Sequence, residues 1–260
     1  MSAQLGELAE DAYAYLGGRP WQQLLATDRF VAVHGPTQHA LGGIATRVRF
    51  GDDFADGVSS VKAWFRDRGR DAFVWSIGPS TTPGDIGARL SEAGAVPMPG
   101  FETASCMVLT DAPPATHDVE VRELTTLEEY ERGADLSAEA FAWGDEHRDA
   151  QKATLRAHWE ARDPTQRATF GAFVDDQLVA IGISSYTDRG VYLDGGATLP
   201  QARGRGAYSA LVAARWVDAV RRGTPALVVQ AGPMSAPILE RLGFESVATV
   251  EFLRDSSDPR

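Results

Sequence analysis

Apolar residues recur along this 260-residue chain with two spacings, which together predict a mixture of helices and strands. Repeats of three and four residues predict helices at residues 5–16, 52–68, 85–93, 127–141, 150–162, 207–222 and 235–242. Alternating or continuous apolar runs predict strands at residues 30–33, 41–48, 72–77, 103–109, 119–124, 168–174, 177–186, 191–200, 226–230 and 247–253. The mixture indicates an α+β or mixed α/β fold.

A proline-rich stretch near the middle divides the chain into two halves of similar length. Residues 111–116 read Asp-Ala-Pro-Pro-Ala-Thr, and proline continues neither a helix nor a central strand. We therefore expect an N-terminal domain at residues 1–112 and a C-terminal domain at residues 117–260. Each half ends on a helix, a glycine (Gly94 or Gly243) and a strand, which suggests a duplicated fold.

Composition narrows the class of protein. Hydrophobic residues make up 43% of the chain, enough for a packed core, and the formal net charge of −11 disfavours a nucleic-acid partner and favours cationic ones. Cys106 is the only cysteine, so no intrachain disulfide is expected. The acidic start lacks the features of a secretion signal, and no apolar run approaches the ~18 residues that span a membrane. We expect a cytoplasmic protein without a membrane partner.

The stretch Gln201-Ala202-Arg203-Gly204-Arg205-Gly206 lies between a predicted strand and a predicted helix. The first amides of a helix lack intrahelical partners and carry partial positive charge, so this loop is suited to a phosphate or diphosphate. Arg203 and Arg205 add full charges beside it. A dinucleotide-binding loop is disfavoured, because no third glycine follows and no βαβ unit with a ribose-binding acid is evident.

These residues resemble the signature of the GNAT superfamily of N-acetyltransferases, Gln/Arg-x-x-Gly-x-Gly/Ala after a Val-x-Pro strand end. Gln201, Gly204 and Gly206 match it after Thr198-Leu199-Pro200, with Thr in place of Val. A later strand, a short helix and Gly243-Phe244 match a second feature of the family. The resemblance covers residues 119–254. It implies a GNAT-like fold with a mostly antiparallel sheet that is splayed at a cofactor cleft, and a tandem arrangement whose first half is a degenerate copy.

The resemblance further implies that acetyl-CoA or another acyl-CoA binds the second half. Its diphosphate would lie on the amides from Arg203 to Ala207, and its pantetheine arm along Ala197, Thr198 and Leu199. The cofactor-binding residues are therefore expected to be Ala197, Thr198, Leu199, Gln201, Arg203, Gly204, Arg205, Gly206 and Ala207. Gly195 and Gly196 would mark a bulge where the strand leaves its neighbour.

The reaction implied is direct attack of a primary amine of a small molecule or peptide on the thioester. The family's usual tyrosine acid is replaced by Leu239, and the asparagine that often precedes its helix by Gly232. Tyr208 is a candidate substitute acid, with a core or surface role as the alternative. Asp194 is a candidate base, with a solvated strand carboxylate as the alternative.

The acceptor pocket is expected beside the segment between the first two helices of the second half, where the family places it. Trp143 and Glu146 there, with Tyr192 on the strand, would suit a cationic amine, and an ordinary polar loop is the alternative. No metal is expected, because His34 and His39 lack ligand spacing. A catalytically silent acyl-CoA-binding or regulatory module is the alternative function. The identity of the acceptor and the oligomeric state stay open.

Overall fold

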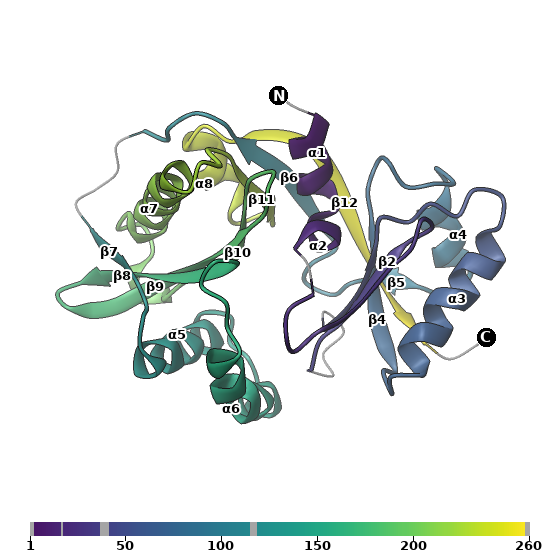
Figure 1. Ribbon diagram of the computed structural model, residues 1–260, viewed down its shortest axis with the longest axis horizontal. Helices are drawn as coiled ribbons and strands as arrows, with labels where there is room; N and C mark the ends of the chain where they lie inside the picture. The colour runs from purple at the N-terminus through teal and green to yellow at the C-terminus, as the bar shows by residue number, and fades with distance from the viewer. Residues whose placement is uncertain (1–2, 17, 37–41, 115–118, 258–260) are drawn as a thin grey trace.

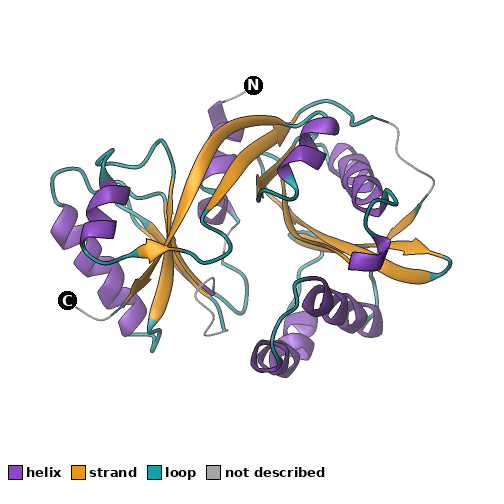
Figure 2. Ribbon diagram, turned by 180° about the vertical axis from the view of Figure 1, so that it is seen from behind, coloured by secondary structure: helices purple, strands orange, loops and turns teal. Residues whose placement is uncertain are grey.

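The computed structural model of the chain describes residues 3–16, 18–36, 42–114 and 119–257. Within these residues one mixed sheet runs through the whole molecule in the order β1-β2-β3-β4-β12-β6-β11-β10-β9-β8-β7, with β5 beside β12 (Figures 1 and 2). Its described strand pairs are antiparallel except β3–β4 and β10–β11. The mixed α/β class and the mostly antiparallel sheet are confirmed.

The helices are α1 (Ala3–Glu10), α2 (Ala12–Tyr15), α3 (Phe54–Arg66), α4 (Ile86–Glu92), α5 (Leu127–Ala140), α6 (Asp145–Glu160), the 3-10 helix η2 (Pro200–Ala202), α7 (Ala207–Arg221) and α8 (Ala236–Arg241). The strands are β1 (Gln23–Ala26), β2 (Val31–His34), β3 (Gly43–Thr46), β4 (Ala72–Ile77), β5 (Val96–Pro97), β6 (Thr103–Leu109), β7 (Glu120–Glu123), β8 (Arg167–Val174), β9 (Gln177–Tyr186), β10 (Val191–Thr198), β11 (Leu227–Ala231) and β12 (Glu245–Ser256).

The two halves repeat one order of elements. In the first half the three-stranded meander β1-β2-β3 is followed by α3, β4, α4 and β6. In the second half β8-β9-β10 is followed by α7, β11, α8 and β12. In each half the third meander strand runs parallel to the strand that follows the long helix. The fold is therefore duplicated, as the two helix-glycine-strand endings suggest.

The last strand of each half is placed in the sheet of the other half. β6 pairs with β11 of the second half, and β12 pairs with β4 of the first half. The two exchanged strands also pair with each other at the centre of the sheet. The predicted domains at residues 1–112 and 117–260 thus share one continuous sheet, and the boundary between them stays a prediction.

Helices cover both faces of the second half of the sheet (Figure 1). Leu211 of α7 packs on one face against residues of β8 and β9, including Phe170 and Ala180. Leu136 of α5 packs on the other face against Ile181. Leu8 of α1 belongs to a third cluster, against β6, β11 and β12. Because successive side chains of a strand point to opposite faces of the sheet, these contacts indicate the face on which each candidate residue of a strand lies.

Most predicted elements are present, with four corrections. The first predicted helix is broken at Asp11, which has φ −114° and ψ 42° and so separates α1 from α2. α6 begins at Asp145 rather than residue 150, so Glu146 belongs to the first turn of a helix and not to a connecting loop. β1 and β5 had no predicted counterpart. Residue 41 of a predicted strand, residues 115 and 116 of the predicted linker, and His39 lie outside the described residues.

Candidate active site

β10 and β11 run parallel but are paired over only two residues. Val191 lies opposite Leu227, and Tyr192 lies opposite Val228. Beyond this point β10 stays paired with β9 on its other edge, with an irregularity in register between Asp194 and Ala197. Gly195 within it has φ +54°, which glycine adopts with little strain. The described strands therefore leave the edge of β10 that faces β11 uncovered from residue 193 onward, and the predicted bulge is present.

The loop that follows β10 presents backbone amides at the start of α7. Gly204 and Gly206 have φ of +75° and +83°, and Gly206 is the N-cap of α7. The Arg203 amide donates to the carbonyl of Pro200 at 3.3 Å, so it is already bonded within the loop. Among the residues that the structure describes, the amides of Gly204, Arg205 and Gly206 have no backbone acceptor. The loop thus offers amides to an anion from residue 204 onward, one residue later than expected.

A groove of about 510 Å³, here called the α7 groove, opens beside this loop. It lies between the end of β10, the start of α7 and helix α8, and its lining includes six of the predicted cofactor-binding residues: Ala197, Thr198, Arg203, Gly204, Gly206 and Ala207. Phe141, Met234, Ser235, Ile238 and Arg241 complete much of its wall. Leu199 is instead packed against the core, and Gln201 and Arg205 are exposed outside the lining. The groove therefore runs beside the free edge of β10.

Arg203 holds the loop in place with its side chain. Its Nε donates to the carbonyl of Thr198 at 3.3 Å, and its Nη2 donates to the carbonyl of Ala140 at 3.3 Å. The guanidinium therefore ties the loop to the end of β10 and to the C-terminus of α5. This contact gives Arg203 a structural task beside the groove.

Tyr208 lies against the bulge of β10. A Cβ placed on Gly196 would stand 3.1 Å from Cε2 of the Tyr208 ring, and Tyr208 also lines the α7 groove. Burial raises the pKa of the Tyr208 phenol above its ordinary value, although the nearby Arg215 guanidinium opposes the shift. The phenol is therefore protonated at neutral pH, at the bend in the strand that borders the groove.

Asp194 lies at the other face of β10, next to two arginines. Its Oδ2 is 3.3 Å from Nη2 of Arg19 and 3.7 Å from Nη2 of Arg167. Burial by itself would raise the pKa of Asp194, but the charges of Arg167 and Arg19, together with the Gly195 amide, outweigh it and hold the pKa below its ordinary value. The carboxylate is thus ionised and paired, which makes it a weaker base than the sequence suggests.

Comparison with solved structures identifies the fold. A GCN5-related N-acetyltransferase from Kribbella flavida matches with a TM-score of 0.71 and 16% identity, over 96% of this chain and 95% of that one. A GCN5-related N-acetyltransferase from Sphaerobacter thermophilus matches with a TM-score of 0.61 and 17% identity, over 93% and 84% of the two chains. A tandem GNAT protein from the clavulanic acid biosynthesis pathway matches with a TM-score of 0.58 and 16% identity, over 99% and 95%.

The chain has the tandem GNAT fold. At these identities the likeness is one of fold, and it extends over both halves of the chain. No protein-family model matches the sequence, and no curated protein matches it. The splayed strands, the bulge and the loop before α7 therefore belong to a GNAT fold in this chain.

In the first half of the tandem GNAT fold, two parallel strands also separate after a short pairing, but the amides of the loop between them are already bonded. β3 and β4 are parallel over only Ile44↔Val74 and Ala45↔Trp75, as β10 and β11 are in the second half. In the loop that follows β3, the Arg49 amide donates to the carbonyl of Arg29 at 2.6 Å and the Phe50 amide to that of Thr82 at 2.8 Å. Asp52 and Asp53 add negative charge before α3. This loop is therefore ill suited to a diphosphate.

Two carboxylates, from Glu10 of α1 and from Asp11 after it, occupy the place where β3 and β4 separate. The Oδ1 of Asp11 accepts from the hydroxyl of Thr46 at 2.8 Å and from the Arg47 amide at 2.9 Å, at the end of β3. Glu10 Oε1 accepts from the Ser80 amide at 2.8 Å, just after β4. Both acids are buried. The position where the second half leaves an edge free is thus occupied by the chain itself.

The usual tyrosine position of the GNAT family carries no hydroxyl in this chain. Leu239 of α8 is fully buried in the core, whereas Ile238 and Arg241 of α8 and its N-cap residue Ser235 line the groove. Gly232 accepts from the Ser235 amide at 3.1 Å in the turn before α8. Among the described residues that line the groove, Tyr208 is the tyrosine.

The residues expected to contact the acceptor are divided between two places. Tyr192 is buried on the same face of β10 as Asp194, with its ring 6.3 Å from that of Tyr13. Trp143 lies in the turn between α5 and α6 and stacks on Phe141, which lines the α7 groove, with ring centroids 5.7 Å apart. The side chain of Glu146 lies outside the described residues. Their roles toward an acceptor stay predictions.

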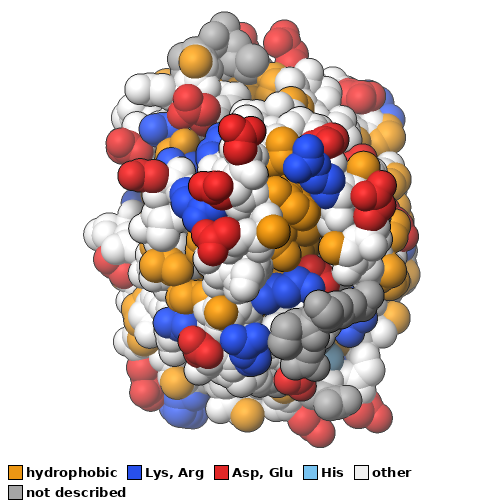
Figure 3. Space-filling model, turned by 90° about the vertical axis from the view of Figure 1, so that its right-hand side faces the viewer, with side chains coloured by type: hydrophobic (Ala, Val, Ile, Leu, Met, Phe, Trp, Pro, Cys, Tyr) orange, Lys and Arg blue, Asp and Glu red, His pale blue; other side chains and the backbone are white. Residues whose placement is uncertain are grey.

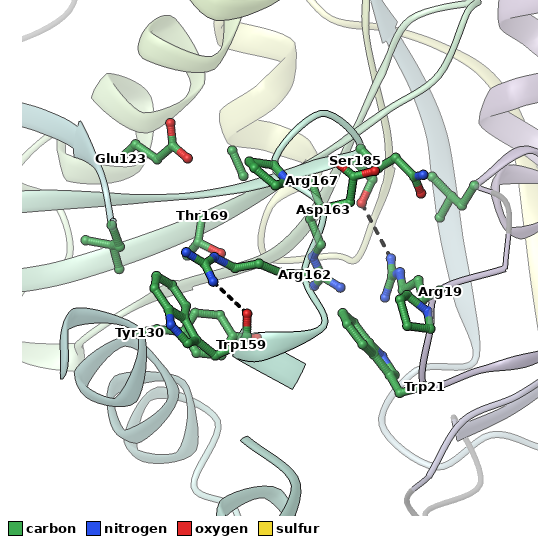
Figure 4. Close-up of a pocket in the computed structure, with 16 residues that line it drawn as sticks. Arg19, Trp21, Glu123, Tyr130, Trp159, Arg162, Asp163, Arg167, Thr169 and Ser185 are labelled. Atoms are coloured by element: carbon green, nitrogen blue, oxygen red, sulfur yellow. Dashed lines mark hydrogen bonds between the residues drawn. The ribbon is translucent and has the colours of Figure 1, made fainter. Parts of the chain in front are cut away.

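A second pocket, here called the Arg19 pocket, lies between the N-terminal segment and helices α5 and α6 (Figure 4). It measures about 60 Å³. Arg19 and Trp21 form one side and Tyr130 and Trp159 the other (Figure 4). Arg19 comes from outside the second half, and no signal near it in the sequence marked it. Arg167 was not predicted as a site residue either. The predicted strand begins at residue 168, whereas β8 begins at Arg167.

Charge on the remaining surface is mixed. Acidic and basic side chains are interspersed over the face formed by the first half (Figure 3). In the described ranges there is no group of three or more His, Cys, Asp or Glu residues arranged to hold a metal ion. None of the described helices is long and apolar enough to cross a bilayer.

Proposed function

We propose that this chain is an acetyl-CoA-dependent N-acetyltransferase that acts on a primary amine of a small molecule or peptide. The observation that carries the proposal is the α7 groove, with free loop amides at one end and the uncovered edge of β10 along its side. A diphosphate fits the amides of residues 204–206 and the positive end of α7. Arg241 in the groove wall adds a further positive charge.

The free edge of β10 indicates where the rest of the cofactor would lie. A pantetheine arm has amide groups that can pair with a strand edge as an added strand would, so it extends from the loop along Ala197 and Thr198. This direction places the thioester near the bulge at Gly195 and Gly196. Tyr208 and Asp194 then lie on the two sides of the reacting carbonyl, from opposite faces of β10.

In the proposed reaction the acceptor ammonium first loses a proton to water. The neutral amine attacks the thioester carbonyl carbon, and a backbone amide near Thr198 stabilises the oxyanion. The carbon–sulfur bond then breaks, and the thiolate takes a proton from the Tyr208 phenol. The amide nitrogen releases its second proton, which restores the phenol through solvent.

We assign proton removal to water rather than to the Asp194 carboxylate. A carboxylate with a lowered pKa and two guanidinium partners accepts a proton poorly. It is suited to attracting an ammonium group toward the bulge, since opposite charges interact strongly in a partly buried site. Asp194 is thus proposed as a substrate-positioning group.

A catalytically silent acyl-CoA-binding module is the second candidate. It is favoured by the buried Leu239 at the usual tyrosine position and by Gly232 in place of asparagine. Under this alternative Tyr208 is a packing residue. The two candidates agree on cofactor binding and differ on turnover.

Thiol release from acetyl-CoA separates the two candidates. The protein is incubated with acetyl-CoA and a panel of primary amines and amino compounds, and free CoA thiol is followed with a thiol-reactive dye. We expect amine-dependent release above the rate without acceptor. Binding of acetyl-CoA without release on any acceptor would favour the silent module, and no binding would reject both.

A further inference from the structure

The Arg19 pocket has an unbalanced charge next to the bulge of β10. Arg19 and Arg167 both approach one oxygen of Asp194, at 3.3 Å and 3.7 Å, so two guanidinium groups share one carboxylate. Only 16% of the Arg19 side chain and 21% of the Arg167 side chain are exposed. A partly buried positive charge without its own counter-ion is costly, and it attracts an anion.

Two acidic side chains line the pocket, and neither neutralises the charge of the two arginines. Glu123 lines the pocket, but it lies on the opposite side of the view from Arg19 (Figure 4). Asp163 also lines it, and its Oδ1 accepts from the amide and hydroxyl of Thr165. His158 stacks against Trp21, and burial and the charges of Arg167 and Arg19 lower its pKa, so it is neutral at pH 7. Arg162 also lines the pocket and adds a positive charge. The anion that would balance the pair is thus not supplied by these side chains.

The two arginines contact β10 next to its bulge, where the proposed reaction takes place. Arg19 Nη2 also lies 3.5 Å from the hydroxyl of Ser185, which lines the pocket, so this one side chain joins the pocket to Asp194 at the bulge. Asp194 is two residues before Gly196, which lines the α7 groove, so the pair contacts β10 next to the bulge from the face opposite Tyr208. The aromatic rings of Trp21, Tyr130 and Trp159 line the space beyond the arginines (Figure 4).

We propose that Arg19 and Arg167 bind the carboxylate of an acceptor that carries its amine close by, as an α-amino acid does. The inference rests on the proposed function and gives its acceptor a chemical class. The carboxylate displaces Asp194 from one guanidinium, and the freed Asp194 oxygen faces the ammonium end of the acceptor. An amino acid is neutral overall, which replaces the cationic acceptor expected from the sequence.

The test compares acids with their matched neutral forms. The common amino acids are screened by thiol release, except proline, which has no primary amine, and cysteine, whose own thiol reacts with the dye. Each active acid is then measured beside its α-amide and its decarboxylated amine, for example phenylalanine, phenylalaninamide and phenethylamine. The inference predicts at least a tenfold higher kcat/KM for the acid. Amides or amines that react as well as the acids would overturn it.

Arginine variants separate binding from a structural role. Arg167→Gln and Arg19→Gln should lower kcat/KM for the acid about tenfold or more and leave that for the amide nearly unchanged. Arg189→Gln is the matched control, because Arg189 ties the same N-terminal segment through Glu7, at 2.7 Å, away from the pocket. It should keep the acid-to-amide ratio of the wild type. Equal losses for acid and amide in the Arg19 and Arg167 variants would make the pair structural and overturn the inference.

Binding distinguishes failure of this inference from failure of the proposed function. Calorimetric titration of the CoA-saturated protein uses the same acids and amides. If no acceptor releases thiol but acids bind and amides do not, the transferase proposal fails while the carboxylate site stands. If neither binds nor reacts, in a protein that binds CoA, the inference is wrong.

Discussion

Lys62 Nζ lies 3.1 Å from Asp255 Oδ1, which joins helix α3 of the first half to the last strand of the second half. The other oxygen of Asp255 accepts from Nε1 of Trp75 at 3.1 Å, and the ion pair is buried. These contacts hold β12 in the sheet of the first half. The exchange of strands is therefore fixed by charge and hydrogen bonding as well as by the backbone ladder.

Replacing Asp255 should destabilise the protein strongly. Asp255→Ala leaves the Lys62 ammonium buried without its partner, and such a change costs about 3 kcal/mol in the free energy of unfolding. Arg29 and Asp56 form the control pair, since Asp56 is on the same helix with 74% of its side chain exposed. Asp56→Ala should cost less than about 1 kcal/mol. Urea unfolding measures both, and equal costs would mean that the buried pair does not anchor β12.

The exchanged strands predict that neither half folds alone. A fragment of residues 1–112 lacks β12, and a fragment of residues 117–260 lacks β6, so each would expose an unpaired sheet edge. Circular dichroism should show each fragment poorly folded by itself and a gain of structure when the two are mixed. Two fragments with separate cooperative melts would instead establish independent domains.

Tyr208→Phe should lower turnover while leaving cofactor binding nearly intact. The phenylalanine keeps the ring against Gly196 and removes the proton donor. General acid catalysis contributes roughly 10²-fold or more, so kcat should fall by about that factor with little change in KM for acetyl-CoA. Tyr186→Phe is a control tyrosine, since its hydroxyl donates to the buried Asp218 of α7 and neither residue lines the α7 groove. An unchanged kcat in Tyr208→Phe would assign thiolate protonation to solvent.

Asp218 should make stability depend on pH in the acid range. Burial tends to raise its pKa, but hydrogen bonds from Tyr186, Arg221 and Arg222 outweigh burial and lower the folded-state pKa below the ordinary value of 3.8. A depressed carboxyl pKa stabilises the fold above the unfolded pKa, and that stabilisation is lost as pH falls through the folded pKa. Asp218→Asn should therefore be less stable than wild type at pH 7, with a difference that shrinks below pH ~4. Urea unfolding across this pH range measures the difference, and the exposed Asp188→Asn is the control variant.

Local patterns in the sequence located most elements, because spacing and turn residues act over a few positions. The strands at residues 72–77, 103–109 and 177–186 have the predicted bounds, and α7 begins at the predicted residue 207. β1 is short and mostly exposed, so its four residues carry little hydrophobic signal. The strand exchange depends on pairing between distant segments, which no local pattern records.

One part of the candidate site could likewise be predicted from a local pattern, and another part could not. The loop before α7 has a local sequence pattern, and its glycines have the positive φ that the pattern suggests. The contact between Arg19 and Asp194 joins residues 175 positions apart and comes from the N-terminal segment, so it could not be predicted from either neighbourhood. The lowered pKa of Asp194 follows from that contact, and the base expected from the sequence changes its role for the same reason.

The most direct test of the central proposal is a calorimetric titration of acetyl-CoA into the wild-type protein and two glycine variants. Gly204→Glu puts a carboxylate beside the free amides, and Gly223→Glu is matched to it, because both glycines have positive φ and open space where a Cβ would stand. We predict micromolar binding to the wild type and to Gly223→Glu, and at least a hundredfold weaker binding to Gly204→Glu. Equal affinity in all three proteins, or no binding to the wild type, would contradict the placement of a diphosphate on the loop before α7.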